Sequence, residues 1–258
     1  MLTRLANPAR FMRMSGAALP FLTITTVGVL GVGLYLALFV APPDYQQGES
    51  VRIMFIHVPA AIMAEGVYYV IALASFVALV WRHPLADVAA QAAAPLGAAF
   101  TLVCLATGSL WGRPMWGTWW VWDARLTSVL VLFFLYLGYI ALVNAFDDPG
   151  RGARAGAVLA LVGVVDLPII KFSVDWWNTL HQPTSILRAG GPTIDKSMLV
   201  PLLIMALGFA LLFSTLLLVR MRTALNERKA RALRLAAPPR RRGTEIPPAP
   251  PDATPALR

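Results

Sequence analysis

The residues best suited to chemistry in this chain are tryptophans and histidines that gather in a few short segments. The run 111–125 reads Trp-Gly-Arg-Pro-Met-Trp-Gly-Thr-Trp-Trp-Val-Trp-Asp-Ala-Arg and holds five of the eight tryptophans of the protein. Two more, Trp176 and Trp177, precede His181. So many large, stiff rings can form a broad apolar surface, which suits a large flat ligand or the headgroup level of a membrane.

The spacing within this run depends on its backbone conformation. In a helix, Trp116, Trp119, Trp120 and Asp123 would share one face. The glycine and proline residues of the run argue against a regular helix. In either case the run can present an aromatic surface.

The chain has three histidines. His83 lies in the short turn Arg82-His83-Pro84, and we expect it to be a solvated loop residue. His57 and His181 are far apart in sequence, and a lone histidine near a helix end is usually a hydrogen-bonded structural residue. If both lie on one side of a membrane beside the aromatic surface, they could instead bind the iron of a flat metallocofactor such as haem from opposite faces.

The composition excludes several classes of protein. Hydrophobic residues make up 58% of the chain and charged residues 14%, against roughly 45–50% and about 25% in soluble domains. This excludes a soluble globular enzyme, a disordered chain and a nucleic-acid-binding domain, so the net charge of +9 predicts no nucleic-acid partner. The single cysteine, Cys104, excludes a disulfide framework and a multi-cysteine metal site. No phosphate-loop motif is present, so we expect no ATP hydrolysis by that route.

The apolar stretches predict an all-α polytopic membrane protein. A bilayer core of about 30 Å requires roughly 20 apolar residues in a helix, and six stretches are long enough. We expect six transmembrane helices at about Ala18–Ala41, Ile53–Trp81, Ala89–Leu110, Leu126–Phe146, Ala153–Phe172 and Ser197–Arg220.

The basic residues predict the orientation of these spans. With a cytoplasmic N-terminus, 16 of the 22 lysines and arginines lie on the cytoplasmic side. The positive-inside rule therefore places both termini in the cytoplasm, where anionic membrane lipid attracts the positive charge. The external connections are then Pro42–Arg52, Trp111–Arg125 and Ser173–Lys196. His57, His181 and seven of the eight tryptophans fall on this outer side, whereas an aromatic belt should mark both interfaces.

The chain divides into a membrane domain and a tail. We expect residues 1–220 to form one six-helix domain with the tryptophan-rich periplasmic loop at 111–125. Residues 221–258 form a basic, proline-rich cytoplasmic tail. Within it, Met221–Ala236 is rich in alanine, arginine and leucine and is able to extend the last helix. Ala237–Arg258 holds seven prolines, and we expect it to be disordered.

Three segments carry a family resemblance. Trp116–Asp123 is similar to the pattern W-G-x-x-W-x-W-D, the WWD signature of haem-handling proteins, and the similarity extends over residues 113–128. Together with residues 55–60 and 176–182, this run resembles the cytochrome c maturation protein C family (CcmC), also called haem exporter protein C. The resemblance covers about residues 15–225.

The resemblance implies a multi-pass protein of the bacterial cytoplasmic (inner) membrane that serves cytochrome c maturation. Members hold haem b non-covalently at the periplasmic face, cradled by the WWD loop, with two axial histidines that match His57 and His181. They pass it to the haem chaperone CcmE, which bonds it covalently. The implied assembly also contains CcmD and the ATPase pair CcmA and CcmB.

These expectations combine into the hypothesis of a haem-presenting scaffold without acid–base catalysis of its own. His57 and His181 bind the iron, and Asp123 orients the loop or contacts the chaperone. Ring contacts come from four tryptophans: Trp116, Trp119, Trp120 and Trp122. Several external basic residues are able to meet the haem carboxylates, namely Arg52, Arg113, Arg125, Arg188 and Lys196, of which Arg125 ends the tryptophan run.

Two alternatives remain at this stage. One is a transmembrane haem or solute transporter subunit, for which Pro95 and Pro168 are the nearest candidates for helix breaks at a midplane site. The other is a bis-histidine electron-transfer cytochrome b, which would need histidines within the spans. Glu65 and Asp166 lie inside predicted spans, where they could serve an ion path or be hydrogen-bonded packing groups.

Overall fold

The computed structural model describes residues 7–182 and 190–236, and its regular elements in these ranges are helices. They are α2 (Pro8–Tyr35), the π-helical turn η1 (Leu36–Val40), the 3₁₀ turn η2 (Glu49–Ile53), α3 (Met54–Trp81), α4 (Pro84–Trp116), α5 (Ala124–Asn144), α6 (Pro149–Gly163), α7 (Asp166–Trp176) and α8 (Lys196–Ala236). Six segments of the described chain are long and apolar enough to cross a membrane. The prediction of an all-helical, six-span membrane protein is confirmed.

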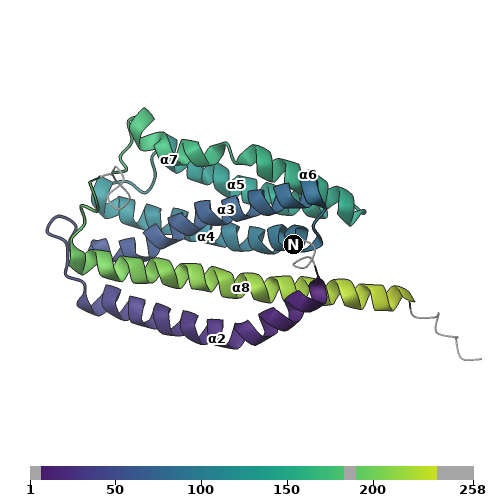
Figure 1. Cartoon of the computed structure of the whole chain (residues 1–258). Helices are drawn as coiled ribbons and strands as arrows, with labels where there is room; N and C mark the ends of the chain where they lie inside the picture. Colours follow the sequence, from purple (N-terminus) through teal and green to yellow (C-terminus); the bar gives the residue numbers. More distant parts are fainter. Residues whose placement is uncertain (1–6, 183–189, 237–258) are drawn as a thin grey trace, which may run out of the picture.

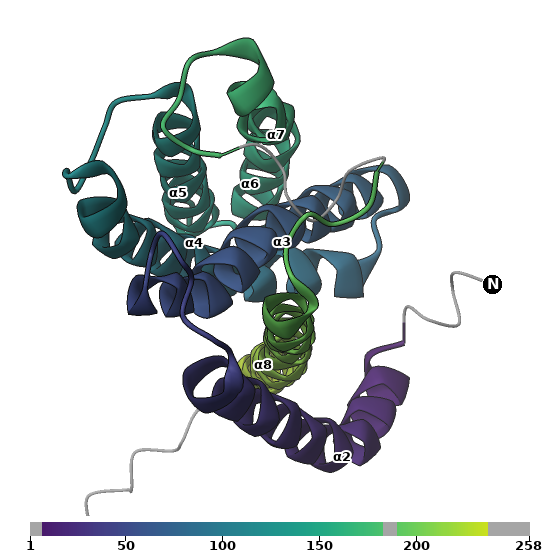
Figure 2. The ribbon, with the colours of Figure 1, turned by 90° about the vertical axis from the view of Figure 1, so that its left-hand side faces the viewer.

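The helices form one elongated bundle and run lengthwise through it (Figure 1), with α2 and α3 inclined to the other helices (Figure 2). Viewed from the end, α2 and α8 pack together on one side, α3 and α4 cross the middle, and α5, α6 and α7 cover the other side (Figure 2). Because α8 also contacts α3 and α4, it joins α2 to the rest of the bundle.

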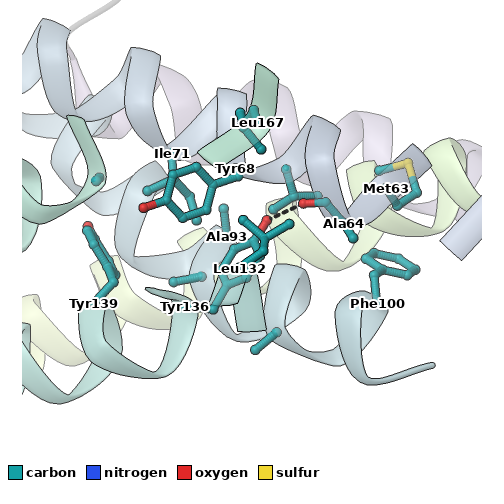
Figure 3. Packing of buried hydrophobic residues seen from close by; sticks show 14 of the residues in the cluster. Met63, Ala64, Tyr68, Ile71, Ala93, Phe100, Leu132, Tyr136, Tyr139 and Leu167 are labelled. Carbon is teal, nitrogen blue, oxygen red and sulfur yellow. Dashed lines mark hydrogen bonds between the residues drawn. The ribbon is translucent and has the colours of Figure 1, made fainter. Parts of the chain in front are cut away.

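Tyrosines and small residues build the centre of the bundle (Figure 3). The rings of Tyr68 and Tyr136 meet edge to face, with centroids 5.2 Å apart, and both are buried. The Tyr136 hydroxyl donates a hydrogen bond of 2.7 Å to the Ala64 carbonyl. Gly97 lies against the Tyr136 ring, where a Cβ atom would come within 2.1 Å of a ring carbon. Small residues on α4 thus let the aromatic rings approach its backbone closely.

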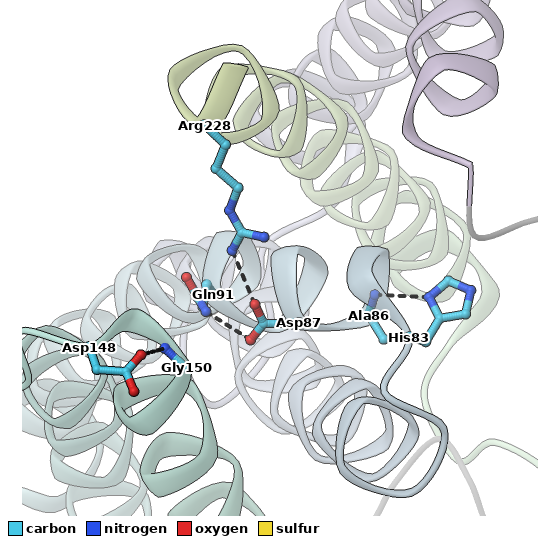
Figure 4. Close-up of polar contacts among 7 residues, drawn as sticks. All are labelled: His83, Ala86, Asp87, Gln91, Asp148, Gly150 and Arg228. Atoms are coloured by element: carbon cyan, nitrogen blue, oxygen red, sulfur yellow. Dashed lines mark hydrogen bonds and ion pairs between the residues drawn. The ribbon is translucent and has the colours of Figure 1, made fainter. Parts of the chain in front are cut away.

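Side-chain caps and one ion pair order the end of the bundle opposite to the tryptophan run (Figure 4). His83, predicted to be a solvated turn residue, is the N-cap of α4, and its Nδ1 atom accepts a hydrogen bond from the Ala86 amide at 3.3 Å. Asp148 caps α6 in a similar way. Arg228 of α8 pairs with Asp87 of α4 at 3.0 Å. The two caps satisfy amides that a helix start leaves free, and the ion pair joins α8 to α4.

The fifth span differs from the uninterrupted helix expected for Ala153–Phe172. It consists of α6 and α7, which are separated at residues 164–165. Pro168 explains the break, because it lacks the N–H that would bond to the Val164 carbonyl in a continuous helix. Instead the Leu167 amide donates to that carbonyl, three residues back, at 3.1 Å. Asp166 begins α7 inside the bundle.

The last helix is longer than the predicted span. α8 continues without interruption to Ala236, so the boundary expected at residue 220 is not a helix end. Arg222, beyond that boundary, donates hydrogen bonds of 2.5 Å to the Met12 carbonyl and 2.8 Å to the Ser15 hydroxyl of α2. Met221–Ala236 thus extends the last helix, as the sequence indicated that it could, although the whole segment 221–258 was assigned to the tail. Residues 237–258 lie outside the described residues.

The three predicted outer connections share one end of the bundle. This end holds the C-terminal ends of α4 and α7 and the start of α8. The other end holds the start of α2 and the end of α8 (Figure 1). This arrangement places the tryptophan run and both candidate iron ligands at the same end.

Candidate functional site

A cavity opens among the helices at the end that holds the tryptophan run. Side chains from α3, α4, α5 and α7, with residues of the connections before η2 and after α7, form its walls. The empty space, including the open mouth, amounts to about 1020 Å³. Its lining is mainly apolar, and its only charged members among the described residues are Glu65 and Arg125.

His57 enters the cavity from the first turn of α3. Its Nδ1 atom lies 3.1 Å from the Cys104 carbonyl oxygen and 3.1 Å from the Thr107 hydroxyl, both on α4. A carbonyl can only accept a hydrogen bond, so Nδ1 carries the proton and Nε2 keeps a free lone pair. Gly108 packs against the imidazole, and a Cβ atom there would come within 2.9 Å of Cε1. α4 therefore fixes both the position and the tautomer of His57.

His181 reaches the same cavity from the connection that follows α7. Its Nδ1 atom lies 3.0 Å from the Gln182 carbonyl, which again leaves Nε2 unprotonated, and its amide donates to the Thr179 hydroxyl at 2.8 Å. Removal from water lowers the pKa of His181, and the positive charge of Arg125 lowers it further. Asp123 and the Gln182 carbonyl oppose this shift. The neutral imidazole, which is the form that binds metal, is thus favoured at neutral pH.

The two histidines lie near one another although 123 intervening residues separate them in sequence. Both line the cavity, and their charges are close enough to interact. Each has its Nδ1 engaged by a backbone carbonyl, the arrangement that metal-binding histidines usually show. These two side chains are therefore suited to hold one metal between them through their Nε2 atoms.

The tryptophan run is helical at its two ends and irregular between them, at residues 117–123. α4 ends at Trp116, and Gly117 adopts a left-handed conformation with φ of 76°. The predicted common helix face is therefore absent. It would have held Trp116, Trp119, Trp120 and Asp123. Gly117 allows the turn at low cost because it has no Cβ atom. Residues 111–116, expected in the loop, belong to the helix.

Only part of the predicted tryptophan set lines the cavity. Trp116 and Trp120 do so, and the Trp116 ring meets His181 edge to face with centroids 6.4 Å apart. Trp120 has a buried Nε1–H without a hydrogen-bond partner in the described chain. Trp119 and Trp122 do not line the cavity and expose 54% and 75% of their surface. The structure thus divides the four rings into an inner and an outer pair.

Trp111 is a cavity residue that the sequence argument did not select. Its ring meets His57 edge to face with centroids 5.7 Å apart, and its Nε1–H donates to the Gln47 side chain at 3.0 Å. Gln47 also lines the cavity from the connection after α2. The four-residue spacing from Trp111 to Met115, which also lines the cavity, was the signal that could have indicated a shared helix face.

Asp123 has a structural position at the end of the run. It is the N-cap of α5, and one carboxylate oxygen accepts a hydrogen bond from the Leu126 amide at 2.8 Å. The other oxygen is buried without a hydrogen-bond partner among the described residues. Asp123 does not line the cavity. It holds the loop to the start of α5, and its charge reaches His181.

Of the basic residues considered for the haem carboxylates, Arg125 alone lines the cavity among those described. One of its guanidinium nitrogens lies 3.4 Å from the Ile170 carbonyl, and no carboxylate of the described chain pairs with it. Arg52 is bound to Glu49 and to the Ala37 carbonyl, and Arg113 to the Gly117 carbonyl. Arg188 lies outside the described residues.

Comparison with known proteins decides the family. The profile of CcmC, heme exporter protein C, matches residues 1–236. Heme exporter protein C of Bradyrhizobium diazoefficiens is 62% identical over 231 residues, which cover 90% of this chain and 88% of that protein. The proteins of the same name from Escherichia coli K12 and Paracoccus denitrificans are 53% and 45% identical, over 86% and 88% of this chain and 89% and 95% of their own lengths. The chain belongs to the heme exporter protein C family.

Membership in the heme exporter protein C family makes this a haem-handling, multi-pass membrane protein. The cavity has the chemistry that haem requires: two imidazoles with free Nε2 atoms, tryptophan walls and one unpaired guanidinium. The orphaned Trp120 Nε1–H adds a buried donor that a ligand could satisfy. The described residues thus fit haem as the substrate of this cavity.

Proposed function

We propose that this protein binds haem b non-covalently in the cavity and presents it to the haem chaperone CcmE during cytochrome c maturation. His57 and His181 are the axial ligands of the iron, one from α3 and one from the connection after α7. The observation that carries the proposal is the pair of imidazoles in one cavity, each with Nδ1 bound to a backbone carbonyl. That arrangement orients Nε2 as the metal ligand.

The remaining cavity residues have roles that follow from their positions. Trp111, Trp116 and Trp120 form apolar walls for the porphyrin ring. Arg125 pairs with a haem carboxylate, because it is the unpaired cation of the lining. Asp123 acts indirectly by holding the tryptophan loop to α5.

The outer tryptophans, Trp119 and Trp122, serve a different purpose in this proposal. Both are exposed beside the cavity rather than part of its wall. Large exposed aromatic rings are common anchors of protein interfaces. We assign them to contact with CcmE, which must approach the haem edge closely for its own histidine to form the covalent bond.

The charge distribution supports a periplasmic site in the bacterial inner membrane. The end of the bundle opposite to the cavity holds the starts of α2 and α6 and the basic C-terminal part of α8. The positive-inside rule places that end in the cytoplasm and the cavity at the periplasmic face. We propose CcmD and the ATPase pair CcmA and CcmB as further partners, since this chain has no phosphate-loop motif of its own.

A spectrum of the protein purified from cells that lack CcmE tests the proposal. Removal of the acceptor should leave haem on the protein, and a pyridine haemochrome assay should identify it as b-type. We expect the low-spin spectrum of an iron with two histidine ligands. His57→Ala and His181→Ala should each lose that spectrum, whereas His83→Ala, a helix cap at the other end, should keep it.

Three other results would contradict the proposal or favour an alternative function. An unchanged low-spin spectrum in both histidine variants would exclude these ligands. Haem uptake into vesicles by this protein alone would favour a transporter. A midplane transport site is usually formed by a pair of broken helices, whereas the described chain has one broken span, between α6 and α7. A haem that cycles between oxidation states and never moves to CcmE would favour an electron-transfer cytochrome b.

A further inference from the structure

Glu65 is a charged residue of the cavity that the proposed function does not use. It lies on α3 eight residues after His57, with Ala61 between them on the same side, and all three line the cavity. Eight residues correspond to a rise of about 12 Å along a helix. Glu65 therefore marks the deep part of the cavity, within the span. Its side chain is half-buried and has no hydrogen bond or ion pair within the described part of the chain.

Few charged groups lie near Glu65 in the described part of the chain. Arg125 is the one other charged residue of the described lining, and its charge acts on Glu65. Other titratable groups share the cavity with Glu65 or interact with it electrostatically: His57 on α3, Cys104 on α4, Arg125 and Tyr136 on α5, Asp166 and Lys171 on α7, and His181 in the connection. A bound haem adds the charge of its iron and of its two carboxylates.

We propose that Glu65 is a redox-linked proton acceptor, so that reduction of the haem iron draws a proton onto its carboxylate. This inference rests on the proposed haem site. One electron from an external one-electron reductant converts iron(III) to iron(II), and one proton from solvent converts the Glu65 carboxylate to the neutral acid. The ligands and the ring are unchanged, and the net charge within the cavity stays constant.

The physical reason is the low dielectric of the site. Because Arg125 pairs with a haem carboxylate in the proposed function, the single positive charge of an iron(III) porphyrin core is what balances the Glu65 carboxylate. Reduction removes that positive charge, and an uncompensated anion in an apolar cavity is costly. At a separation of about 10 Å and an effective dielectric of about 20, one unit charge changes the equilibrium of another on the order of tenfold. Proton uptake by Glu65 relieves this imbalance.

Asp166 supplies a matched control. It is a second carboxyl group within the span, it is buried, and its charge interacts with that of Glu65. It begins α7 at the break after α6 and does not line the cavity. A general effect of intramembrane carboxyl groups would involve both residues, whereas a direct contact with the space around the haem involves Glu65 alone.

The test is the midpoint potential of haem on the purified full-length protein, measured across the neutral pH range. In the wild type we expect the potential to fall with rising pH, by up to about 59 mV for each tenfold change in proton concentration. Glu65→Gln should flatten this dependence and keep the low-spin spectrum. Glu65→Asp should preserve the dependence, and Asp166→Asn should leave it as in the wild type. Comparison with Glu65→Gln also separates Glu65 from the carboxylates of the haem itself.

Each failure has a distinct signature. A wild-type potential that does not change with pH, or a dependence that persists in Glu65→Gln, overturns the inference while the low-spin haem still supports the proposed function. A dependence lost in Asp166→Asn but not in Glu65→Gln transfers the role to Asp166 and also overturns it. Absence of low-spin haem from the wild type overturns the proposed function itself, and with it this inference.

Discussion

The backbone carbonyl oxygen of Cys104 lies 3.1 Å from Nδ1 of His57 and accepts a hydrogen bond from the Nδ1–H group. This contact joins α4 to the imidazole at the start of α3. The contribution of residue 104 comes from its main chain, so the buried thiol has no part in it. The Thr107 hydroxyl lies at the same distance from Nδ1 and provides a second contact. The position of His57 thus depends on α4 as much as on α3.

Thr107→Val removes the side-chain contact to His57 and keeps the Cys104 carbonyl. We expect the affinity for haem to fall about tenfold, at the lower end of the 10–100-fold range for loss of a hydrogen bond to a metal-binding histidine. The spectrum should remain low-spin. Titration with haem in detergent measures the affinity. Thr101→Val is the control, because its hydroxyl bonds to Gly97 on the same helix, away from the cavity. Equal losses in both variants would contradict the role of Thr107.

Gly108→Ala should displace the imidazole of His57. The added Cβ atom would lie 2.9 Å from Cε1, closer than two carbon atoms normally approach. We expect a shift of the bound haem from the low-spin to the high-spin spectrum as the ligand moves away. Gly66→Ala on α3 is the control, since nothing lies within 4 Å of its added atom. A low-spin spectrum in Gly108→Ala would show that the ring can move without loss of the iron bond.

Arg125→Gln should make haem binding more sensitive to acid. The positive charge of Arg125 lowers the pKa of His181, so its removal raises that pKa toward the ordinary value. Protons then compete with iron for His181 at a higher pH, and haem release should begin at a higher pH than in the wild type. An absorption titration from neutral to acidic pH measures this. Lys171→Gln, an exposed cation on α7 outside the cavity lining, should release haem at the wild-type pH.

Gly97→Ala should destabilise the bundle without direct contact with the haem site. Its Cβ atom would come within 2.1 Å of the Tyr136 ring, and overpacking of this kind typically costs about 1–3 kcal/mol. Thermal unfolding in detergent should show a lower midpoint temperature. Gly28→Ala on α2 has open space around the added atom and should match or exceed the wild type. An unchanged midpoint in Gly97→Ala would mean that Tyr136 has room to move.

Several features could be predicted because they depend on local composition. Long apolar stretches must be helices in a bilayer, since only a helix satisfies its own backbone hydrogen bonds there. The number of spans then determines which connections share a side, and this brought His57 and His181 to one end of the bundle. Trp119 and Trp122 show the limit of such reasoning. They belong to the same motif as Trp116 and Trp120, yet they lie outside the cavity.

The sequence by itself determined the helical class, the six spans and the shared end of the two histidines, because hydrophobicity and chain connectivity are local properties. Tertiary packing decided the rest. The tautomer of His57 depends on a carbonyl 47 residues away, and the inner position of Trp120 depends on the turn at Gly117. Arg125 and Glu65 are cavity residues only because α3 and α5 bring them there. The residue pattern of a single helix cannot predict these contacts, because each contact joins groups from different elements.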